Sequence, residues 1–552
     1  MNRFILKRIC IFLLLAFILS IFPAGCSGGK QEADTGTTLA EGTGQGASET
    51  QAETEERIKL KMFMCNSGLD YPDGVDPSNN EYIGIVEDYA NVDLELEVPV
   101  YQDFKTKYEL MMASGSLPDI VHTIYREDAE RAGDQGAFID LKQYYDASTA
   151  LKDTVTAGHM ELAKSGSGHY YRIPMVAMTP VGEGIITRYD LLEKYNGGKF
   201  PASVNEWIEF MRAVKKAEPN STPLASRLVG NNVFRGFNDP IFVWYGARPY
   251  NFRMEGGKFI STFTVPEYKA AVAVMNQMYK EGILDKEFVT SDTNKWLDAL
   301  YNNNLCLVSN ATDQVKSYVQ NAQTRSGAEN NVYAMAPALT AYPEEVKDTK
   351  YVNGYANAGI NSSHGLYISK NCKTPERAFK VIEGFSAEKL YDAIFWGREG
   401  IEYTVKGGQR EIDPVKLADP SRSWVLQLGV IFSFTAGSEA KDAMYKKVWG
   451  EEKFNAVDRS IAPIVESSKE RGVSILGQLP DISGITEKLQ ESYDFISAAT
   501  AKAVMGQTTM EQFDKSVAEY KTKYGFIDEG LTKYINEHKD ELRSRGCKEV
   551  DW

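Results

Sequence analysis

The chain has 552 residues, with 76 acidic residues against 61 lysines and arginines, a net charge of −15 and an isoelectric point near 5.1. Its basic residues are scattered rather than clustered, which argues against the basic patch that nucleic-acid binding needs. After the amino-terminal region about 500 residues remain, too many for one hydrophobic core, so the length predicts at least two lobes.

The amino terminus has the order of a secretory signal. Lys7 and Arg8 precede an uncharged apolar run at 9–22, and the small residues Ala24 and Gly25 follow shortly after it. The run is shorter than the about 20 residues that a membrane-spanning helix needs. We therefore expect residues 1–25 to be a cleaved signal peptide.

Cys26 follows these small residues directly, and the sequence around it resembles the bacterial lipobox, in which the thiol receives a diacylglycerol and becomes the new amino terminus. The alternative is an ordinary signal peptide with an incidental cysteine. Two acyl chains suffice for a stable membrane anchor. Beyond Cys26, the segment up to residue 56 has one large aliphatic residue, Leu39, so we expect 26–56 to be the lipidated cysteine and a disordered tether. These features predict an extracellular protein anchored by lipid to the outer face of the cell membrane.

The first folded segments alternate between strand and helix patterns. Apolar residues occupy every second position in 58–64 and 92–100, which predicts strands, and a short apolar strand follows at 117–124. The segments between them, 81–92 and 103–115, have helical spacing. Such an alternation of strands and helices predicts a parallel sheet covered by helices.

Ligands of parallel sheets bind outside the carboxyl ends of the strands. We therefore expect ligand contacts from residues that follow the first and third strands. These are Asn66, Ser67, Thr123, Tyr125 and Arg126.

Two capping boxes mark later helices. Ser203 and Glu206 precede the apolar face of a helix that runs to about residue 214, and Thr508 and Glu511 stand near the carboxyl terminus. Each pair predicts a helix start.

The middle of the chain adds a helix and a strand to the second lobe. Residues 266–282 begin with proline and end with glycine, as helices do. Segment 294–310 is typical of a helix followed by a strand. Asn310 and Asp313 follow this strand, and we expect them to bind ligand hydroxyls.

Several motifs carry a resemblance to a known family. They are SGSLPDIV at 114–121, YYRIPMV at 170–176, TRYDLLEKY at 187–195, PASVNEWIEFMRAVKKA at 201–217, KTPERAFKVIEGF at 373–385, WGREGIEYTVKGG at 396–408 and GQTTMEQFDKSVAEYKTKYG at 506–525. In this order the chain resembles family 1 extracellular solute-binding proteins of ABC importers, in the subgroup of long oligosaccharide-binding lipoproteins of Gram-positive bacteria.

The resemblance implies an α/β fold, a type II periplasmic-binding-protein-like clamp of two lobes, each a mainly parallel sheet flanked by helices. The hinge crossovers are expected near 175–180, 359–364 and 424–432. The expected lobes are 57–178 plus 364–425 for the first, and 179–363 plus 426–552 for the second.

The resemblance also implies a function. A monomer without cofactor or catalytic residues would capture an oligosaccharide between its lobes and deliver it to the permease of an ABC transporter. Several long members of the family have a calcium loop rich in Asp, Asn and Gly after the helix that matches 204–217, where this chain has AEPNSTPLASR. That segment lacks alternating oxygen ligands, so we expect no calcium there. The five histidines also lack the spacing of a zinc site.

A sugar site needs aromatic faces and planar polar groups that converge on a cleft. Trp244 and Tyr245 stand beside a glycine and are predicted loop residues, with burial in the core as the alternative. Trp296 lies on a predicted helix and has the same alternative. A predicted turn carries three more candidates, for which a structural role is also open: Trp396, Arg398 and Glu399.

Other functions remain open. A surface-tethered polysaccharide-degrading enzyme would need two carboxylates flanking the scissile bond. The chain shows no GxSxG, HExxH or phosphate-binding loop in a setting that would favour another hydrolytic mechanism. An adhesive lipoprotein would show no ligand-dependent change in shape. A peptide ligand would favour strand edges over stacked rings.

Two chemical properties stay open as well. A charged sugar is compatible with the sequence, since its carboxylate could pair with Arg126, Arg248 or Arg398. A disulfide is possible among four widely spaced cysteines, Cys65, Cys306, Cys372 and Cys547.

Overall fold

The computed structural model describes residues 56–176, 182–236, 239–312, 314–326, 332–344, 346, 364–432, 437–471, 475–480, 482–548 and 552. They belong to one compact unit, Glu55–Trp552. The predicted signal peptide, Cys26 and the tether up to residue 55 lie outside the described residues. No helix in the described ranges is long and apolar enough to cross a membrane.

The first lobe is built on a five-stranded mixed sheet in the order β2-β1-β3-β10-β4. Strand β1 (Ile58–Phe63) runs parallel to β2 (Val92–Glu97) and β3 (Ile120–Thr123). Strand β10 (Gly365–Ile368) runs antiparallel to β3 and to β4 (Ile173–Pro174). The predicted strand and helix alternation is thus confirmed for the first three strands, where side chains in β2 alternate between buried and exposed.

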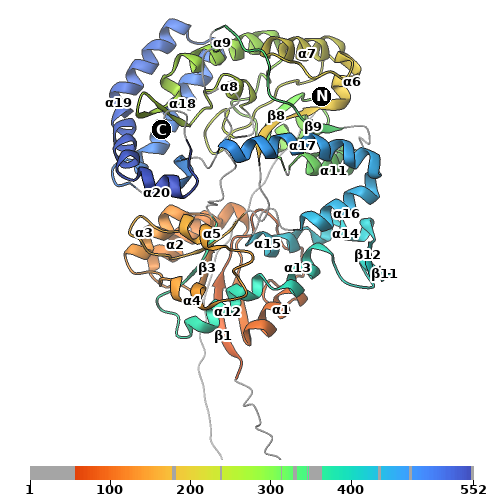
Figure 1. The fold of residues 1–552 in the computed structure, drawn as a ribbon, viewed down its shortest axis with the longest axis vertical. Coiled ribbons are helices and arrows are strands. Elements are labelled where there is room, and N and C mark those ends of the chain that lie inside the picture. Colours follow the sequence, from red (N-terminus) through yellow and green to blue (C-terminus); the bar gives the residue numbers. More distant parts are fainter. Residues whose placement is uncertain are drawn as a thin grey trace, which may run out of the picture. The chain divides into compact units, whose positions relative to one another are not determined.

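Helices cover both faces of this sheet (Figure 1). Because successive strand residues point to opposite faces, Leu60 and Met62 of β1 join a core with α1 (Glu81–Ala90) and α12 (Pro375–Phe385). Phe63 joins the opposite core with α2 (Tyr101–Ser114) and α3 (Arg126–Asp134). The remaining first-lobe helices are α4 (Lys142–Ala147), α5 (Ala157–Leu162) and α13 (Glu388–Phe395).

The second lobe contains a three-stranded sheet in the order β8-β5-β9. Strand β5 (Glu183–Arg188) pairs antiparallel with β8 (Leu307–Ala311) and with β9 (Tyr333–Met335). The expectation of a mainly parallel sheet in each lobe is therefore wrong for the second lobe. Apolar runs predict that a strand forms, but strand direction depends on how the long connections return to the sheet.

The helices of the second lobe form two cores beside this sheet. One contains side chains of the central helices and of the long carboxyl-terminal pair α18 and α19, and the other contains side chains of α10, α11 and α17. The elements are α6 (Tyr189–Asn196), α7 (Val204–Ala217), α8 (Pro240–Trp244), hairpin β6 (Phe252–Glu255) and β7 (Lys258–Ser261), η1 (Thr262–Thr264), α9 (Pro266–Glu281), α10 (Thr293–Tyr301), α11 (Gln314–Ser326), α17 (Glu451–Arg471), η3 (Leu476–Gln478), α18 (Thr486–Val504), α19 (Met510–Glu537) and α20 (Lys539–Ser544).

The connection from the first core to the second is made by the segment 403–457. It contains the hairpin β11 (Tyr403–Lys406) and β12 (Gln409–Ile412), then α14 (Pro414–Leu417), η2 (Pro420–Val425), α15 (Leu426–Val430) and α16 (Ser438–Trp449). Leu428, Phe432 and Ala440 still pack in the first-lobe core, and Val457 of α17 packs in the second. The expected boundary at 425 is therefore too early, because these apolar side chains extend the first core to residue 440.

Two of the expected crossovers meet in space. The backbone N–H of Val176 donates to the carbonyl of Phe432 at 2.7 Å. Residues 177–181 and 433–436, which continue these two segments, lie outside the described residues, as do 359–363.

The two helices with predicted capping boxes do form, but in each case at least one capping hydrogen bond joins residues other than the predicted pair. The Ser203 hydroxyl accepts from the Glu206 N–H at 3.2 Å, but the Glu206 carboxylate accepts from Ala202 rather than from Ser203. The predicted capping box at 508 and 511 is wrong by one residue. Helix α19 is capped by Thr509 and Gln512, which exchange both hydrogen bonds.

Candidate functional site

The residues that follow β1 and β3 come to one edge of the first sheet. Phe63, the last residue of β1, pairs with Val121, two residues before the end of β3. Asn66 and Ser67 on one side and 123–126 on the other therefore leave the sheet next to each other, as the carboxyl-end rule predicts. We call this region the carboxyl edge.

Asn66 fixes the shape of the loop after β1. It is buried, its Oδ1 accepts from the N–H of Gly68 at 3.0 Å and its Nδ2 donates to Asp70 at 2.7 Å. Ser67 has a φ of 54°, in the left-handed region. Thr123 is also buried and its Oγ1 accepts from the N–H of Tyr125 at 3.1 Å. Asn66 and Thr123 thus position the two loops.

Aromatic rings stack beside these loops. The ring of Tyr125 lies 5.9 Å from that of Phe104, nearly parallel, and 5.3 Å from that of Tyr108. Burial raises the pKa of the Tyr125 hydroxyl, and the neighbouring Tyr101 hydroxyl and Cys65 thiol raise it further. Tyr101 is 46% exposed and opens α2 after the end of β2. It was not among the predicted contacts, although the carboxyl-end rule applied to the second strand would have found it.

Arg126 connects the carboxyl edge to the second lobe. Its guanidinium is nearly buried, lies 2.7 Å from the Glu127 carboxylate and donates to the carbonyl of Leu479 at 3.3 Å. Leu479 belongs to a second-lobe core. The side chain that the sequence assigned to ligand binding is therefore at a place where the two lobes touch.

Four residues at this edge hold buried polar atoms that have no hydrogen-bond partner among the described residues. We call them the carboxyl-edge polar group; they are Ser67, Tyr71, His122 and Gln427, through Oγ, the hydroxyl, both ring nitrogens and Oε1, respectively. Burying such atoms without partners costs about 1–3 kcal/mol each. A native structure that carries this cost at one place calls for an explanation.

Separate segments of the chain assemble this group. The Gln427 amide of α15 donates to the carbonyl of Leu69 at 3.2 Å, and the Tyr71 ring lies 4.8 Å from that of Trp424. His122 lies on β3 beside the backbone of Cys65, without a hydrogen bond of normal geometry. No local sequence signal marks Tyr71, His122 or Gln427, because what distinguishes them is their set of neighbours after folding.

The two histidines near the edge are uncharged at neutral pH. Their rings lie 5.6 Å apart. Burial and then His364 lower the pKa of His122 to about 3, and burial and then Arg172 lower that of His364 to about 4. A neutral imidazole offers one donor and one acceptor, which suits a hydroxyl. Arg172 is fully buried, and its guanidinium donates to Glu130 at 3.2 Å and to the His364 carbonyl at 3.1 Å.

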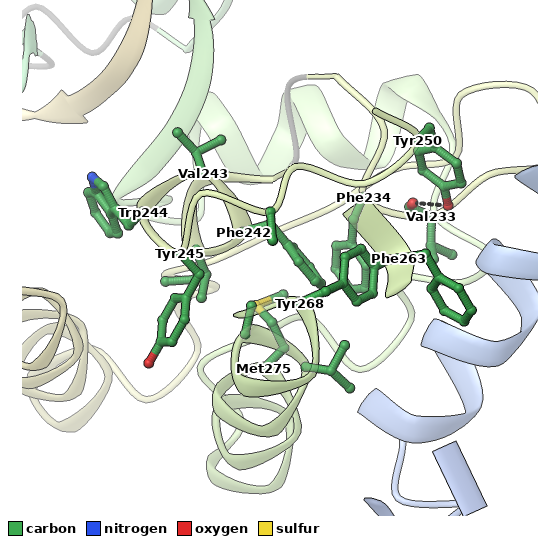
Figure 2. Packing of buried hydrophobic residues seen from close by; sticks show 14 of the residues in the cluster. Val233, Phe234, Phe242, Val243, Trp244, Tyr245, Tyr250, Phe263, Tyr268 and Met275 are labelled. Atoms are coloured by element: carbon green, nitrogen blue, oxygen red, sulfur yellow. Dashed lines mark hydrogen bonds between the residues drawn. The ribbon is translucent and has the colours of Figure 1, made fainter. Parts of the chain in front are cut away.

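The predicted aromatic pair Trp244 and Tyr245 lies in the core of the second lobe (Figure 2). Trp244 ends helix α8, is 3% exposed and stacks on Trp207 at 5.5 Å. Tyr245 is buried as well. The prediction of a loop is wrong, because Pro240 starts a short helix whose apolar residues are all buried, and five residues are too few to show a helical period.

Other second-lobe candidates are partly accounted for. Trp296 lies on α10, as expected, and is buried. The Arg227 guanidinium lies 5.5 Å from its ring centre, and these contacts favour a role in the core rather than in ligand binding. Asn310 lies near the end of β8 and donates to the Tyr318 hydroxyl at 2.6 Å. Asp313 lies outside the described residues.

The turn at 396–400 belongs to the surface of the first lobe. Trp396 follows α13 and packs against the first-lobe core, with Arg410 at 5.0 Å from its ring centre. The Arg398 guanidinium is held by Glu402 at 2.5 Å and by Glu81 at 2.9 Å, and Glu399 is exposed. These contacts place the turn with hairpin β11 and β12 and with α1.

Metal ligands do not gather in the described ranges, where no group of three His, Cys, Asp or Glu side chains is arranged to hold an ion. Glu218, in the segment for which we expect no calcium site, accepts from the Tyr195 hydroxyl at 2.7 Å and from Lys194 at 3.0 Å. The four cysteines of the described part of the chain form no disulfide with one another; they are Cys65, Cys306, Cys372 and Cys547.

Comparison with known proteins agrees with this architecture. Residues 85–392, more than half of the chain, match the family described as bacterial extracellular solute-binding protein. The polygalacturonan/rhamnogalacturonan-binding protein YtcQ of Bacillus subtilis is 21% identical over 495 residues, which cover 88% of this chain and 92% of YtcQ.

Two further similarities differ in extent. Lipoprotein LipO of Bacillus subtilis is 26% identical over 227 residues, 39% of this chain, and the match spans less than half of LipO, 43%. The crystal structure of the ABC-transporter substrate-binding protein FusA of S. pneumoniae, in complex with kestose, has a TM-score of 0.63 at 18% identity, covering 87% of this chain and 99% of FusA. At this identity the likeness shows the two-lobed fold alone.

Proposed function

The chain belongs to the bacterial extracellular solute-binding protein family, and from this membership we propose that it captures an oligosaccharide between its two lobes and delivers it to the permease of an ABC transporter. Two of the similar proteins are named for a polysaccharide or solved with an oligosaccharide, YtcQ and FusA respectively. We also propose that residues 1–25 are removed, that Cys26 carries the lipid anchor and that the protein acts as a monomer.

The observation that carries the sugar proposal is the carboxyl-edge polar group. Its hydroxyls, amide oxygen and imidazole nitrogens, which have no hydrogen-bond partner in the described part of the chain, are buried beside aromatic rings, among them Trp424 and Tyr71. A sugar supplies hydroxyls that donate and accept, and its C–H face packs on aromatic rings. Because these atoms are enclosed in the present conformation, ligand access requires the loop 65–71 or α15 to move away, and the return movement would enclose the ligand, as in a hinged binding protein.

A hydrolytic role receives less support from the same edge. Of the acids near the site, Glu127 and Glu130 are paired with Arg126 and Arg172, and Asp70 accepts a hydrogen bond from the Asn66 amide. Glycoside hydrolysis needs one carboxyl group free to give a proton and a second to act as nucleophile or base. Chromatography of each oligosaccharide after long incubation should therefore return it uncleaved.

Replacing Tyr71 with phenylalanine tests the proposal through two readouts. The change removes a buried hydroxyl without a partner, so the unliganded protein should be as stable as the parent or up to about 1–3 kcal/mol more stable. Oligosaccharide affinity should fall about tenfold, which corresponds to the about 1.4 kcal/mol of one hydrogen bond. Urea denaturation and calorimetric titration give the two numbers.

Tyr145→Phe is the matched control. The Tyr145 hydroxyl is buried in the same lobe but donates to the carbonyl of Val155 at 2.7 Å. Its removal should lower the unfolding free energy by about 1 kcal/mol and leave affinity unchanged. If Tyr71→Phe behaves like this control, the carboxyl-edge polar group does not bind the ligand and the site is misplaced.

A further inference from the structure

We infer that the ligand is an uncharged oligosaccharide rather than a polyuronate. The inference rests on the proposed function and narrows it to a class of sugar. It starts from the three arginines that the sequence offered as partners of a ligand carboxylate, and from the side chains that each of them contacts in the folded protein.

Protein carboxylates already occupy these arginines. Arg126 is held by Glu127 at 2.7 Å. Arg248 is held on two sides, by Asp239 at 2.7 Å and by Glu183 at 2.9 Å. A bidentate bond to a uronate needs a pair of guanidinium N–H groups in the fixed fork geometry, and in each case at least part of that fork is engaged.

Two other arginines of the first lobe are held in the same way. Arg398, the third of the sequence candidates, donates to Glu402 through Nε at 3.0 Å and Nη2 at 2.5 Å, which is the bidentate arrangement that a uronate would need. Arg172 is fully buried against Glu130.

The acids that hold these arginines cannot easily be released. The side chains of Asp239, Glu130 and Glu402 are at most 11% exposed, so a ligand carboxylate that displaced one of them would leave a buried acid without its cation. Asp239 also accepts a short hydrogen bond from the Ser309 hydroxyl, which fixes it further. Three other acids of these pairs are more exposed: Glu127 at 42%, Glu183 at 26% and Glu81 at 54%.

Two of these pairs involve segments that the sequence assigned to ligand binding, whereas the Arg398 pair lies elsewhere on the surface of the first lobe. Glu183 opens β5 opposite Ala311, next to Asn310 at the end of β8, and Arg126 is at the carboxyl edge. Among the paired groups named here acids outnumber bases, with Asp70, Glu127, Glu130, Glu183 and Asp239 against Arg126, Arg172 and Arg248.

Other charged residues of the chain also disfavour an acidic ligand. Two other second-lobe arginines stack on rings, Arg227 over Trp296 at 5.5 Å and Arg235 over Tyr493 at 5.3 Å. The whole chain carries a net charge of −15, which slows the approach of a polyanion at low salt. By contrast, the carboxyl-edge polar group offers uncharged donors and acceptors.

The test compares sugars that differ only in charge. The full chain, extracted from membranes in mild detergent, is titrated by calorimetry with oligogalacturonates and alginate oligomers. Matched neutral probes are galacto-oligosaccharides and the methyl esters of the same oligogalacturonates, together with kestose and gluco-, manno- and xylo-oligosaccharides. We expect a neutral probe to bind, and every acidic oligomer to bind at least about tenfold more weakly than its neutral counterpart.

A variant that frees an arginine provides the second arm. Glu183→Gln removes one of the two acids that hold Arg248, and should reduce the difference in affinity between an acidic oligomer and its neutral counterpart. Glu281→Gln is the control, because it removes an acid from the Arg212 pair elsewhere on the second lobe, and it should leave this difference in affinity unchanged. Tighter binding of an acidic oligomer than of its methyl ester overturns the inference and leaves the proposed function standing. Binding of neither set overturns the proposed function, and the inference with it.

Discussion

Replacing Trp244 with alanine should unfold the second lobe more easily and leave oligosaccharide affinity unchanged. The Trp244 ring is 3% exposed and stacks on the fully buried Trp207 with an interplanar angle of 22°. A tryptophan side chain buries about 200 Å². At about 25 cal/mol per Å² this corresponds to about 5 kcal/mol, and core Trp→Ala changes fall in the range of about 3–5 kcal/mol.

We therefore expect a loss of about 4 kcal/mol, or about 4 °C in melting temperature for the unit Glu55–Trp552. Urea denaturation followed by circular dichroism measures the first number, and calorimetric titration measures affinity in the same preparation. Trp244→Phe is the control, because it keeps an apolar ring on Trp207 and should lose about half as much or less. A drop in affinity of more than about tenfold with stability intact would refute the burial argument and return Trp244 to the ligand site.

Three local contacts lead to further predictions. Arg172→Met leaves Glu130 buried without its cation and should lower the unfolding free energy by about 3–5 kcal/mol at pH 8. Because burial raises the pKa of Glu130, the folded state binds more protons than the unfolded one, so this loss of stability should shrink as the pH falls towards 5. Denaturation curves measure the loss at each pH, and a loss that does not change with pH would contradict the reasoning. Thr509→Ala removes the α19 cap and should cost about 1 kcal/mol in urea denaturation, while Thr508→Ala should cost less than about 0.5 kcal/mol; equal effects would contradict the assigned cap. Chelation by EDTA should leave the melting temperature within about 1 °C, since the Glu218 carboxylate is already hydrogen-bonded, and a fall of several degrees would reveal a bound metal ion.

Local sequence patterns predicted the first two strands of the first lobe well because buried and exposed residues alternate along most of their length, whereas β3 and β10 are buried throughout. Strands β1 and β2 have this period, and Gly115 ends α2 in the left-handed conformation that favours glycine. The direction of β5 against β8 is a different kind of property. It is set by long connections whose packing no short window of sequence records.

The candidate site shows the same division. The carboxyl-end rule predicted that Asn66 and Thr123 lie at one edge of the sheet, and they do, since this placement depends on strand order alone. It could not locate Gln427, which reaches the loop after β1 across a separation of 358 residues from Leu69. Trp244 was misplaced for the opposite reason: its stretch is too short for periodicity to distinguish a buried helix from a loop.

The central claim is that an oligosaccharide is held at the carboxyl edge by both lobes. Hydrogen exchange measured with and without an oligosaccharide that raises the melting temperature tests it most directly. The account predicts slower amide exchange in segments 65–71, 122–126 and 424–430 of the first lobe and in 309–312 of the second. Slower exchange confined to one lobe, or to segments away from these, would contradict it.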